Sequence, residues 1–381
     1  MVSVNSSEKR KQALITIWNA AVAAVSGQAA VEKAIADDSD FQPDLVIAVG
    51  KAAVGMCRGA LDSLEGPHEA IVVTKYEHAD DDIRSREGVR LIESGHPIPD
   101  QHSLDAGAVL LNRVQSMPTG SRLLLLVSGG ASALAEALPT GMTLEDLQMI
   151  ADEMISTGKT IGEINNRRKQ TSLIKDGKLL EQFNGAEIRV YAISDVEGDS
   201  ISTIGSGIGD CHRVVVKATS SIIASNQIAR GRAVEAAQTL GLEVQQNQET
   251  LYDDVFKLAP QIGAKLRDAK PGVYIWGGEP TIILPDKPGQ GGRNQSLALA
   301  ISEHLLGIDN VMLLVAGTDG TDGPTSAAGG LVDGNTFARA DAARVALKKA
   351  DAGRYLEQQD SLFVTGPTNT NVMDLAIAII D

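Results

Sequence analysis

The chain has 381 residues, of which 43% are hydrophobic and 22% charged, the balance of a globular protein of about two domains. Its formal net charge of −15 disfavours binding to nucleic acid or to anionic membranes, because both surfaces are negative. The two cysteines, Cys57 and Cys211, form no C-x-x-C pair, so we expect no disulfide framework. Residues 1–10 show no signal-peptide pattern, and the sequence has no apolar run long enough to span a membrane, so we expect a cytoplasmic protein.

The first part of the chain predicts alternating helices and strands. Leu14, Ile17, Ala21 and Val25 recur at helical spacing and predict one amphipathic helix over residues 9–36. Short apolar runs predict buried strands at 44–50, 70–74, 89–93, 122–127, 189–193 and 213–216, with helices at 51–64 and 103–115. This alternation predicts an N-terminal doubly wound Rossmann-like sheet within a domain over residues 1–235.

The same alternation starts again after a helical stretch predicted at 220–240. Strands are predicted at 272–276, 281–284, 311–315 and 361–365, and helices at 253–269, 295–306, 341–350 and 371–379. We therefore expect an α/β protein of two domains, the second being a smaller C-terminal α/β domain over residues 240–381.

Three segments of the first domain follow predicted strands, where ligands of such sheets bind. Lys51 stands at a helix N-terminus, the small residues Ser128, Gly129, Gly130 and Ser132 can present backbone N–H groups to a phosphate, and Asp195 can hold Mg²⁺. Each also has a purely structural interpretation: Lys51 as a solvated lysine, the loop at 128–132 as a tight turn, and Asp195 as an Asx-turn or helix cap.

Three further loops gather in the second domain. Arg293 lies among glycines just before a helix, and its guanidinium suits a carboxylate or a phosphate. Gly317, Thr318 and Asp319 follow one predicted strand, and Thr368 follows the last. Three such loops in one region favour a ligand site over coincident turns.

Several function classes lack their motifs. The chain has no Walker loop, no G-x-G-x-x-G after the first strand, no H-E-x-x-H and no G-x-S-x-G, which disfavours dinucleotide-dependent reductases, zinc hydrolases and serine esterases. His96 lies in a predicted loop, where we expect a structural, hydrogen-bonded histidine.

Taken in order, these segments resemble the glycerate 2-kinase family, whose C-terminal part is called the MOFRL domain, from about residue 10 to residue 380. The matching segments are VGKAA at 49–53, SGHP at 94–97, LVSGG at 126–130, EIN at 163–165, SDV at 194–196, GGE at 277–279, GGRNQ at 291–295, GTDG at 317–320, DGPT at 322–325 and TGPT at 365–368. The resemblance implies transfer of the γ-phosphoryl group of ATP to the 2-hydroxyl of D-glycerate, with Mg²⁺, in a cleft between two domains.

The resemblance also implies roles for single residues. Lys51 would stabilise the transferring phosphoryl group, Arg293 would hold substrate or phosphate charge, and Asp195 and Asp319 would bind metal or position the hydroxyl. The residues expected to bind nucleotide or phosphate are Ser128, Gly129, Gly130, Ser132, Asn165, Gly317, Thr318 and Thr368. Glycerate and ATP are the expected partners, and a homodimer stays open.

The chain departs from the family pattern in ligand-binding loops. Gln170 replaces a histidine, Ala131 a glycine, Ile208 a proline and Pro280 a threonine. A kinase of another small hydroxy acid, an NAD(P)H-dependent hydroxypyruvate reductase and a non-catalytic ligand sensor therefore remain alternatives.

Overall fold

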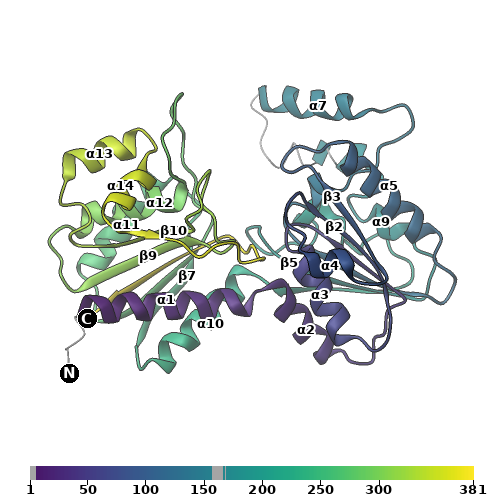
Figure 1. The fold of residues 1–381 in the computed structure, drawn as a ribbon, viewed down its shortest axis with the longest axis horizontal. Helices are drawn as coiled ribbons and strands as arrows, with labels where there is room; N and C mark the ends of the chain where they lie inside the picture. Colours follow the sequence, from purple (N-terminus) through teal and green to yellow (C-terminus); the bar gives the residue numbers. More distant parts are fainter. Residues whose placement is uncertain (1–5, 157–165, 168) are drawn as a thin grey trace. The chain divides into compact units, whose positions relative to one another are not determined.

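The computed structural model describes residues 6–156, 166–167 and 169–381, and it divides the chain into two compact units (Figure 1). The parallel-sheet unit comprises Ser26–Ser225 and Asn369–Asn371, and the mixed-sheet unit comprises Met1–Val25, Asn226–Thr368 and Val372–Asp381. The units are therefore not the contiguous stretches 1–235 and 240–381 expected from sequence, because the first helix joins the later unit and a short C-terminal segment returns to the earlier one.

The parallel-sheet unit contains six parallel strands in the order β3-β2-β1-β4-β5-β6, which confirms the Rossmann-like sheet. The strands are β1 (Leu45–Val49), β2 (Glu69–Lys75), β3 (Val89–Ser94), β4 (Arg122–Val127), β5 (Glu187–Ile193) and β6 (Lys217–Ala224). The strand order reverses between β1 and β4, and Val49 pairs with Val127 at their carboxyl ends. A ligand of this fold binds outside that pair of ends.

Helices cover both faces of this sheet. Helices α2 (Gly27–Asp37) and α3 (Ala53–Ser63) pack on one face, and α5 (Gln101–Gln115), α6 (Ala131–Leu134) and α9 (Lys178–Glu181) bury the other. The remaining elements are α4 (Asp81–Ser85), α7 (Leu144–Ser156) and the 3₁₀ turn η1 (Ile204–Gly207). The central strands β1 and β4 are buried on both sides, which explains their continuous apolar runs.

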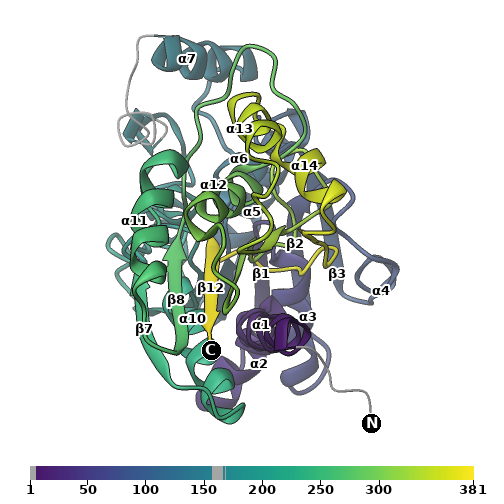
Figure 2. The same cartoon turned by 90° about the vertical axis from the view of Figure 1, so that its left-hand side faces the viewer.

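The mixed-sheet unit contains six strands in the order β11-β10-β9-β12-β8-β7, with β12 antiparallel to both β8 and β9. Figure 2 shows β7, β8 and β12 side by side. The strands are β7 (Val244–Glu249), β8 (Gly272–Gly278), β9 (Val311–Gly317), β10 (Gly329–Asp333), β11 (Leu362–Phe363) and β12 (Asp374–Ile380). Helices α1 (Ser6–Ala24) and α10 (Asn226–Thr239) cover one face. Helices α11 (Val255–Arg267) and α12 (Arg293–Leu305) cover the other, with α13 (Ala340–Lys348) and α14 (Ala352–Gln358) packed beside α12.

Several predicted elements are wrong. The helix predicted at 371–379 is the strand β12, whose residues are all buried, and a short apolar run does not distinguish a buried strand from a buried helix. The strand predicted at 213–216 lies in a loop, and β6 replaces the start of the helix predicted at 220–240. The segment 281–284 forms only one isolated bridge, at Thr281. The helix predicted over 9–36 is two helices, the second capped by Ser26, which accepts from the Ala29 N–H at 3.3 Å.

Among the described residues, no single helix has the length and apolar composition needed to cross a membrane. Helices α1 and α2 meet those criteria only when they are counted together across the break between them.

Candidate functional site

Lys51 directly follows β1, where two loops of the parallel-sheet unit pack backbone against backbone. Gly50 has φ +130°, and a Cβ added there would lie 2.1 Å from Ser128 Oγ, so only glycine fits this approach. The Lys51 N–H donates to the Gly129 carbonyl at 2.9 Å, and the Ala52 N–H donates to Ser128 Oγ at 3.1 Å. These bonds fix the start of α3 beside the loop that follows β4.

The side chain of Lys51 runs along this glycine loop. Gly130 has φ +83°, and a Cβ added there would lie 3.2 Å from Lys51 Cγ. The half-buried Lys51 has no carboxylate partner in the described part of the chain. An ammonium group beside small residues at the carboxyl ends of parallel strands is suited to bind an anion.

Asp195 meets the same loop from β5. A Cβ added at Gly129 would lie 1.8 Å from Asp195 Oδ2, so the carboxylate packs directly on the glycine backbone. Ser132 is half-buried in α6 on the same loop. The structure thus brings together Lys51, Asp195 and the loop from Ser128 to Ser132, whereas Asn165 lies outside the described residues.

His96 adds a group that sequence reasoning assigned to structure alone. Its ring lies against Gly130, where an added Cβ would be 3.0 Å from Cδ2 and 3.1 Å from Nε2. Burial and, to a smaller extent, the nearby charges of Lys51, Lys75 and His78 together lower the pKa of His96 to about 4. The SGHP segment was a signal for this residue, but a histidine in a loop does not by itself indicate a ligand site.

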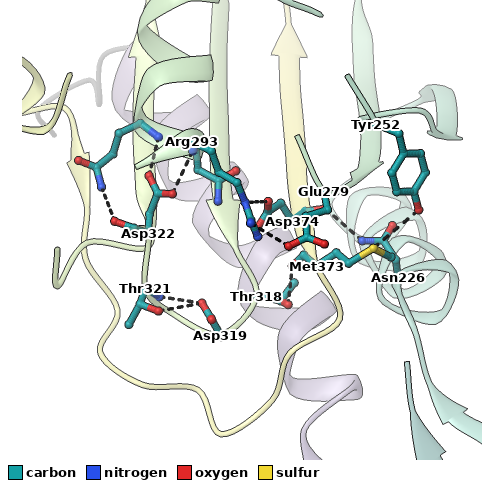
Figure 3. Close-up of polar contacts among 12 residues, drawn as sticks. Asn226, Tyr252, Glu279, Arg293, Thr318, Asp319, Thr321, Asp322, Met373 and Asp374 are labelled. Atoms are coloured by element: carbon teal, nitrogen blue, oxygen red, sulfur yellow. Dashed lines mark hydrogen bonds and ion pairs between the residues drawn. The ribbon is translucent and has the colours of Figure 1, made fainter. Parts of the chain in front are cut away.

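In the mixed-sheet unit, Arg293 begins α12 and lies between two carboxylates (Figure 3). Its Nε donates to Asp374 Oδ2 at 2.7 Å, and Nη1 contacts Glu279 Oε1 at 2.8 Å. Burial would lower the pKa of Arg293, but Asp374 and Glu279 outweigh it and the pKa rises. Arg293 is therefore a neutralised cation, with part of its guanidinium edge left to contact a ligand.

Asp374 opens β12 and is almost completely buried. Its register partners are Gly278 at the end of β8 and Gly317 at the end of β9. Burial raises the pKa of Asp374, while the charge and hydrogen bond of Arg293 lower it. Because both register partners of Asp374 are glycines, the sheet leaves room for the buried ion pair between Asp374 and Arg293.

Asp322 caps α12 from a distant loop. Its Oδ1 accepts from the Asn294 N–H at 3.0 Å and its Oδ2 from the Gln295 N–H at 2.8 Å. Burial raises the pKa of Asp322 to about 7, although these two N–H donors act in the opposite direction. The contact explains Gly292, because a Cβ there would lie 2.2 Å from the Asp322 carboxyl carbon. Asp322 is the first residue of the DGPT segment, but no role was predicted for it from the sequence.

The loop residues predicted to bind nucleotide bond mainly to one another. The Thr318 hydroxyl donates to the Met373 carbonyl at 2.6 Å, and the Thr368 hydroxyl donates to the Thr318 carbonyl at 2.5 Å. Asp319 Oδ1 accepts from the Thr321 N–H at 3.0 Å (Figure 3). A Cβ added at Gly317 would lie 3.2 Å from Asp374 Oδ1, so these loops and Arg293 meet at one end of the mixed sheet.

The two aspartates predicted to bind metal belong to different units, Asp195 to the parallel-sheet unit and Asp319 to the mixed-sheet unit. Within the described ranges, no group of three or more His, Cys, Asp or Glu side chains is arranged to hold a metal ion. Mg²⁺ at a nucleotide site takes one or two carboxylates together with phosphate oxygens and waters, so a single aspartate at either position fits part of that ligand set.

The four departures from the family pattern differ in their surroundings. Gln170 is exposed, whereas Ile208 is buried in the core beneath the glycine loop. Ala131 is buried, and a Cβ added at Gly205 would lie 3.0 Å from its methyl group. Pro280 is buried just after β8, next to Glu279. Ala131 therefore packs inward, away from the solvent side of the loop.

Comparison with known proteins defines the class to which this fold and site belong. Residues 13–240 match DUF4147, a domain of unknown function, and residues 272–374 match the MOFRL family. D-glycerate 2-kinase of Thermotoga maritima is 32% identical, with 98% of this chain and 99% of that protein covered. The crystal structure of the glycerate kinase from Thermotoga maritima superposes with a TM-score of 0.90 at 30% identity over 98% of this chain and 100% of the other.

Two further relatives differ from each other in the activity that their names give. Glycerate 2-kinase of Pyrococcus horikoshii is 33% identical over 88% of this chain and 87% of that protein. A protein of Agrobacterium vitis, provisionally named hydroxypyruvate reductase, is 31% identical over 88% of this chain and 99% of that protein. The chain is a two-unit α/β protein of the DUF4147–MOFRL class. It belongs to the glycerate kinase family.

Proposed function

We propose that this chain is an ATP-dependent glycerate 2-kinase, which transfers the γ-phosphoryl group of ATP to the 2-hydroxyl of D-glycerate and releases 2-phosphoglycerate and ADP. The observation that carries the proposal is the Lys51 ammonium, held without a carboxylate partner among the described residues beside the loop from Ser128 to Ser132. The names of the relatives from Thermotoga maritima and Pyrococcus horikoshii support the choice of glycerate and of its 2-hydroxyl.

Lys51 carries the main electrostatic role in this proposal. Phosphoryl transfer requires in-line alignment and positive charge near the equatorial oxygens of the migrating group, and little covalent chemistry from the protein. The Lys51 ammonium supplies that charge, and Ser128, Gly129, Gly130 and Ser132 bind the phosphate or the substrate through small side chains and backbone N–H groups. The packing of Gly50 on Ser128 fixes this geometry before the ligand arrives.

The mixed-sheet unit supplies a second set of proposed contacts. Arg293 holds a phosphate or carboxylate with the N–H groups that Asp374 and Glu279 leave unused. The loops around Gly317, Thr318 and Thr368 present backbone groups rather than hydroxyls to the nucleotide, because both threonine hydroxyls donate within the fold. Asn165 completes the proposed nucleotide-binding set.

Mg²⁺ enters the proposal through its two candidate ligands. Asp195 or Asp319 would hold the ion, which when bound with ATP neutralises charge on the β- and γ-phosphates. Asp195 has the stronger support, because it lies against the same glycine loop as Lys51. Asp319 already uses Oδ1 to order its own turn, which leaves Oδ2 for a ligand.

The proposal is tested by an ADP-release assay with ATP, Mg²⁺ and a panel of small hydroxy acids that includes both glycerate enantiomers and tetronates. Phosphorus NMR of the product then distinguishes 2-phosphoglycerate from 3-phosphoglycerate. D-glycerate giving 2-phosphoglycerate is the expected result. Faster turnover of another hydroxy acid, or a 3-phosphorylated product, would correct the substrate or the position of transfer.

Reduction of hydroxypyruvate is the second candidate, favoured by the name of the Agrobacterium vitis relative. Its readout is protein-dependent loss of NADH or NADPH absorbance with hydroxypyruvate. A non-catalytic sensor is separated from both enzymes by calorimetry, because it would bind ATP without forming ADP. Kinase activity with no reductase activity is the outcome we expect.

A further inference from the structure

The ring of His96 has no hydrogen-bond partner among the described residues, in contrast to the rings of His68 and His102. His68 contacts the Pro43 and Glu65 carbonyls at 3.1 and 2.9 Å, and His102 contacts the Tyr76 hydroxyl at 2.6 Å. His96 is half-buried and makes no comparable contact. A partly buried imidazole without a protein partner has both ring nitrogens available to a ligand.

The ring of His96 lies beside the glycine loop, at Gly130. His96 follows β3 after one glycine, and its Nε2 and Cδ2 face Gly130. The same glycine faces Lys51 Cγ, so the imidazole and the lysine stem approach one backbone position from within a single unit. Any side chain at residue 130 would fill this space, which is therefore kept open by glycine.

Burial, together with nearby positive charges, favours the neutral form of the His96 ring. The groups that face it are Lys51, Lys75 and His78, and together with burial they lower the pKa of His96 to about 4. Near neutral pH the ring therefore has one N–H donor and one free lone pair. The lysines suit anionic groups, whereas a neutral lone pair suits a hydroxyl.

We propose that His96 is a catalytic residue that accepts the proton of the substrate hydroxyl as this hydroxyl attacks the γ-phosphorus of ATP. The inference rests on the kinase function proposed above. The hydroxyl oxygen forms a bond to phosphorus while the bond from phosphorus to the oxygen of ADP breaks, and ADP leaves with that electron pair. The proton passes to a ring nitrogen of His96 and then to water, and the positive charge of Lys51 favours its release.

Asp195 is the other group that could accept this proton. Its carboxylate lies on Gly129, next to the glycine that faces His96. A carboxylate is a hard oxygen ligand suited to Mg²⁺, whereas a neutral imidazole amid lysines is not. We therefore assign metal binding to Asp195, which lies on Gly129, and proton acceptance to His96, which lies on Gly130.

Substitution of His96 with chemical rescue tests this inference in the full chain. In His96→Ala we expect kcat to fall by about 10²–10⁴-fold, the range for loss of a general base. The KM values for ATP and hydroxy acid should change by less than about threefold, because binding charges remain. Imidazole added to the buffer should restore turnover at least about tenfold, since it can enter the space left by the ring.

Two further variants separate chemistry from folding. His96→Gln keeps a hydrogen-bonding group but cannot take a proton, so it should lose turnover at an unchanged melting temperature. His212→Ala changes an exposed histidine paired with Asp210 at 3.1 Å and should keep full activity. A kcat for His96→Ala within about threefold of the unmodified chain, or a lost rate that imidazole does not restore, overturns the inference. An unmodified chain that phosphorylates no hydroxy acid overturns the proposed kinase function as well.

Discussion

Arg293 donates from Nε to the carboxylate of Asp374 over 2.7 Å, joining the first residue of α12 to the first residue of β12. The carboxylate is 2% exposed, whereas the arginine side chain is 35% exposed. The buried acid therefore orients an arginine that can still reach a ligand, and the pair connects the stability of the sheet to the position of a proposed binding group.

Asp374→Asn should lower the free energy of unfolding by about 1–3 kcal/mol, because it removes the buried negative charge that pairs with Arg293 and leaves only a neutral acceptor for the hydrogen bond. Urea unfolding measures the change. The matched control is Glu303→Gln, which breaks the exposed pair with Arg344 and should cost less than about 1 kcal/mol. Equal effects of the two substitutions would remove the distinction between these ion pairs.

Lys51→Ala should reduce kcat by about 10²–10³-fold, the typical loss when one group that stabilises transition-state charge is removed. Its melting temperature should stay unchanged, since the bonds that fix this turn come from the Lys51 backbone. Lys33→Ala, at an exposed position of α2, is the control and should be fully active. Near-normal turnover of Lys51→Ala would exclude Lys51 from the mechanism.

Asp322 should make stability depend on pH. Burial raises its pKa in the folded chain from 3.8 to about 7, so the folded state holds a proton that the unfolded state releases. This contribution is fully present below about pH 4 and is lost as the pH rises through about 7. Relative to Asp322→Asn, the unmodified chain should lose on the order of 4 kcal/mol across that range in urea unfolding. A difference that stays constant with pH would show that Asp322 is ionised throughout.

Glu136→Gln should destabilise the parallel-sheet unit. Glu136 and Lys175 form a buried ion pair, with side chains 0% and 2% exposed. Removing the carboxylate leaves the ammonium without its buried counter-charge, at a cost of about 3–5 kcal/mol by urea unfolding. The double substitution with Lys175→Met should recover much of that loss, and failure to recover would place the cost in packing rather than in charge.

Gly231→Ala should stabilise the chain by about 0.5–1 kcal/mol, because alanine restricts the unfolded chain and favours a helix interior. Gly231 lies inside α10, and a Cβ added there meets no atom within 4 Å. Thermal unfolding measures the effect. Gly50→Ala is the opposite case, since the added Cβ would overlap Ser128, and it should destabilise.

The buried parallel strands were the elements best predicted from the sequence. A run such as Leu123–Val127 is apolar at every inward and outward position, so it indicates a strand covered on both faces. The polar strand Val244–Glu249 has no such pattern and was missed, and β12 was assigned to a helix. The local pattern of apolar residues does not show which distant strands a segment pairs with. Both β7 and β12 are strands because of such pairing.

The site was predicted in the same uneven way. The position of Lys51 was predictable because it follows a buried strand and a glycine, and its role stays a prediction. The role of Asp322 was not found, because the N–H groups that it caps belong to residues 294 and 295. His96 was expected to be structural, and its significance appears only when the ring is seen beside Gly130 without a hydrogen bond.

The central place of β12 has a consequence for synthesis of the chain. A ribosome makes β7 to β11 before it makes β12, yet β12 is the strand that joins β8 to β9. Until Asp374–Ile380 leaves the exit tunnel, the nascent mixed sheet consists of two halves with unpaired inner edges. Unpaired edges of this kind are templates for pairing with another chain, and β12 closes them by inserting between β8 and β9.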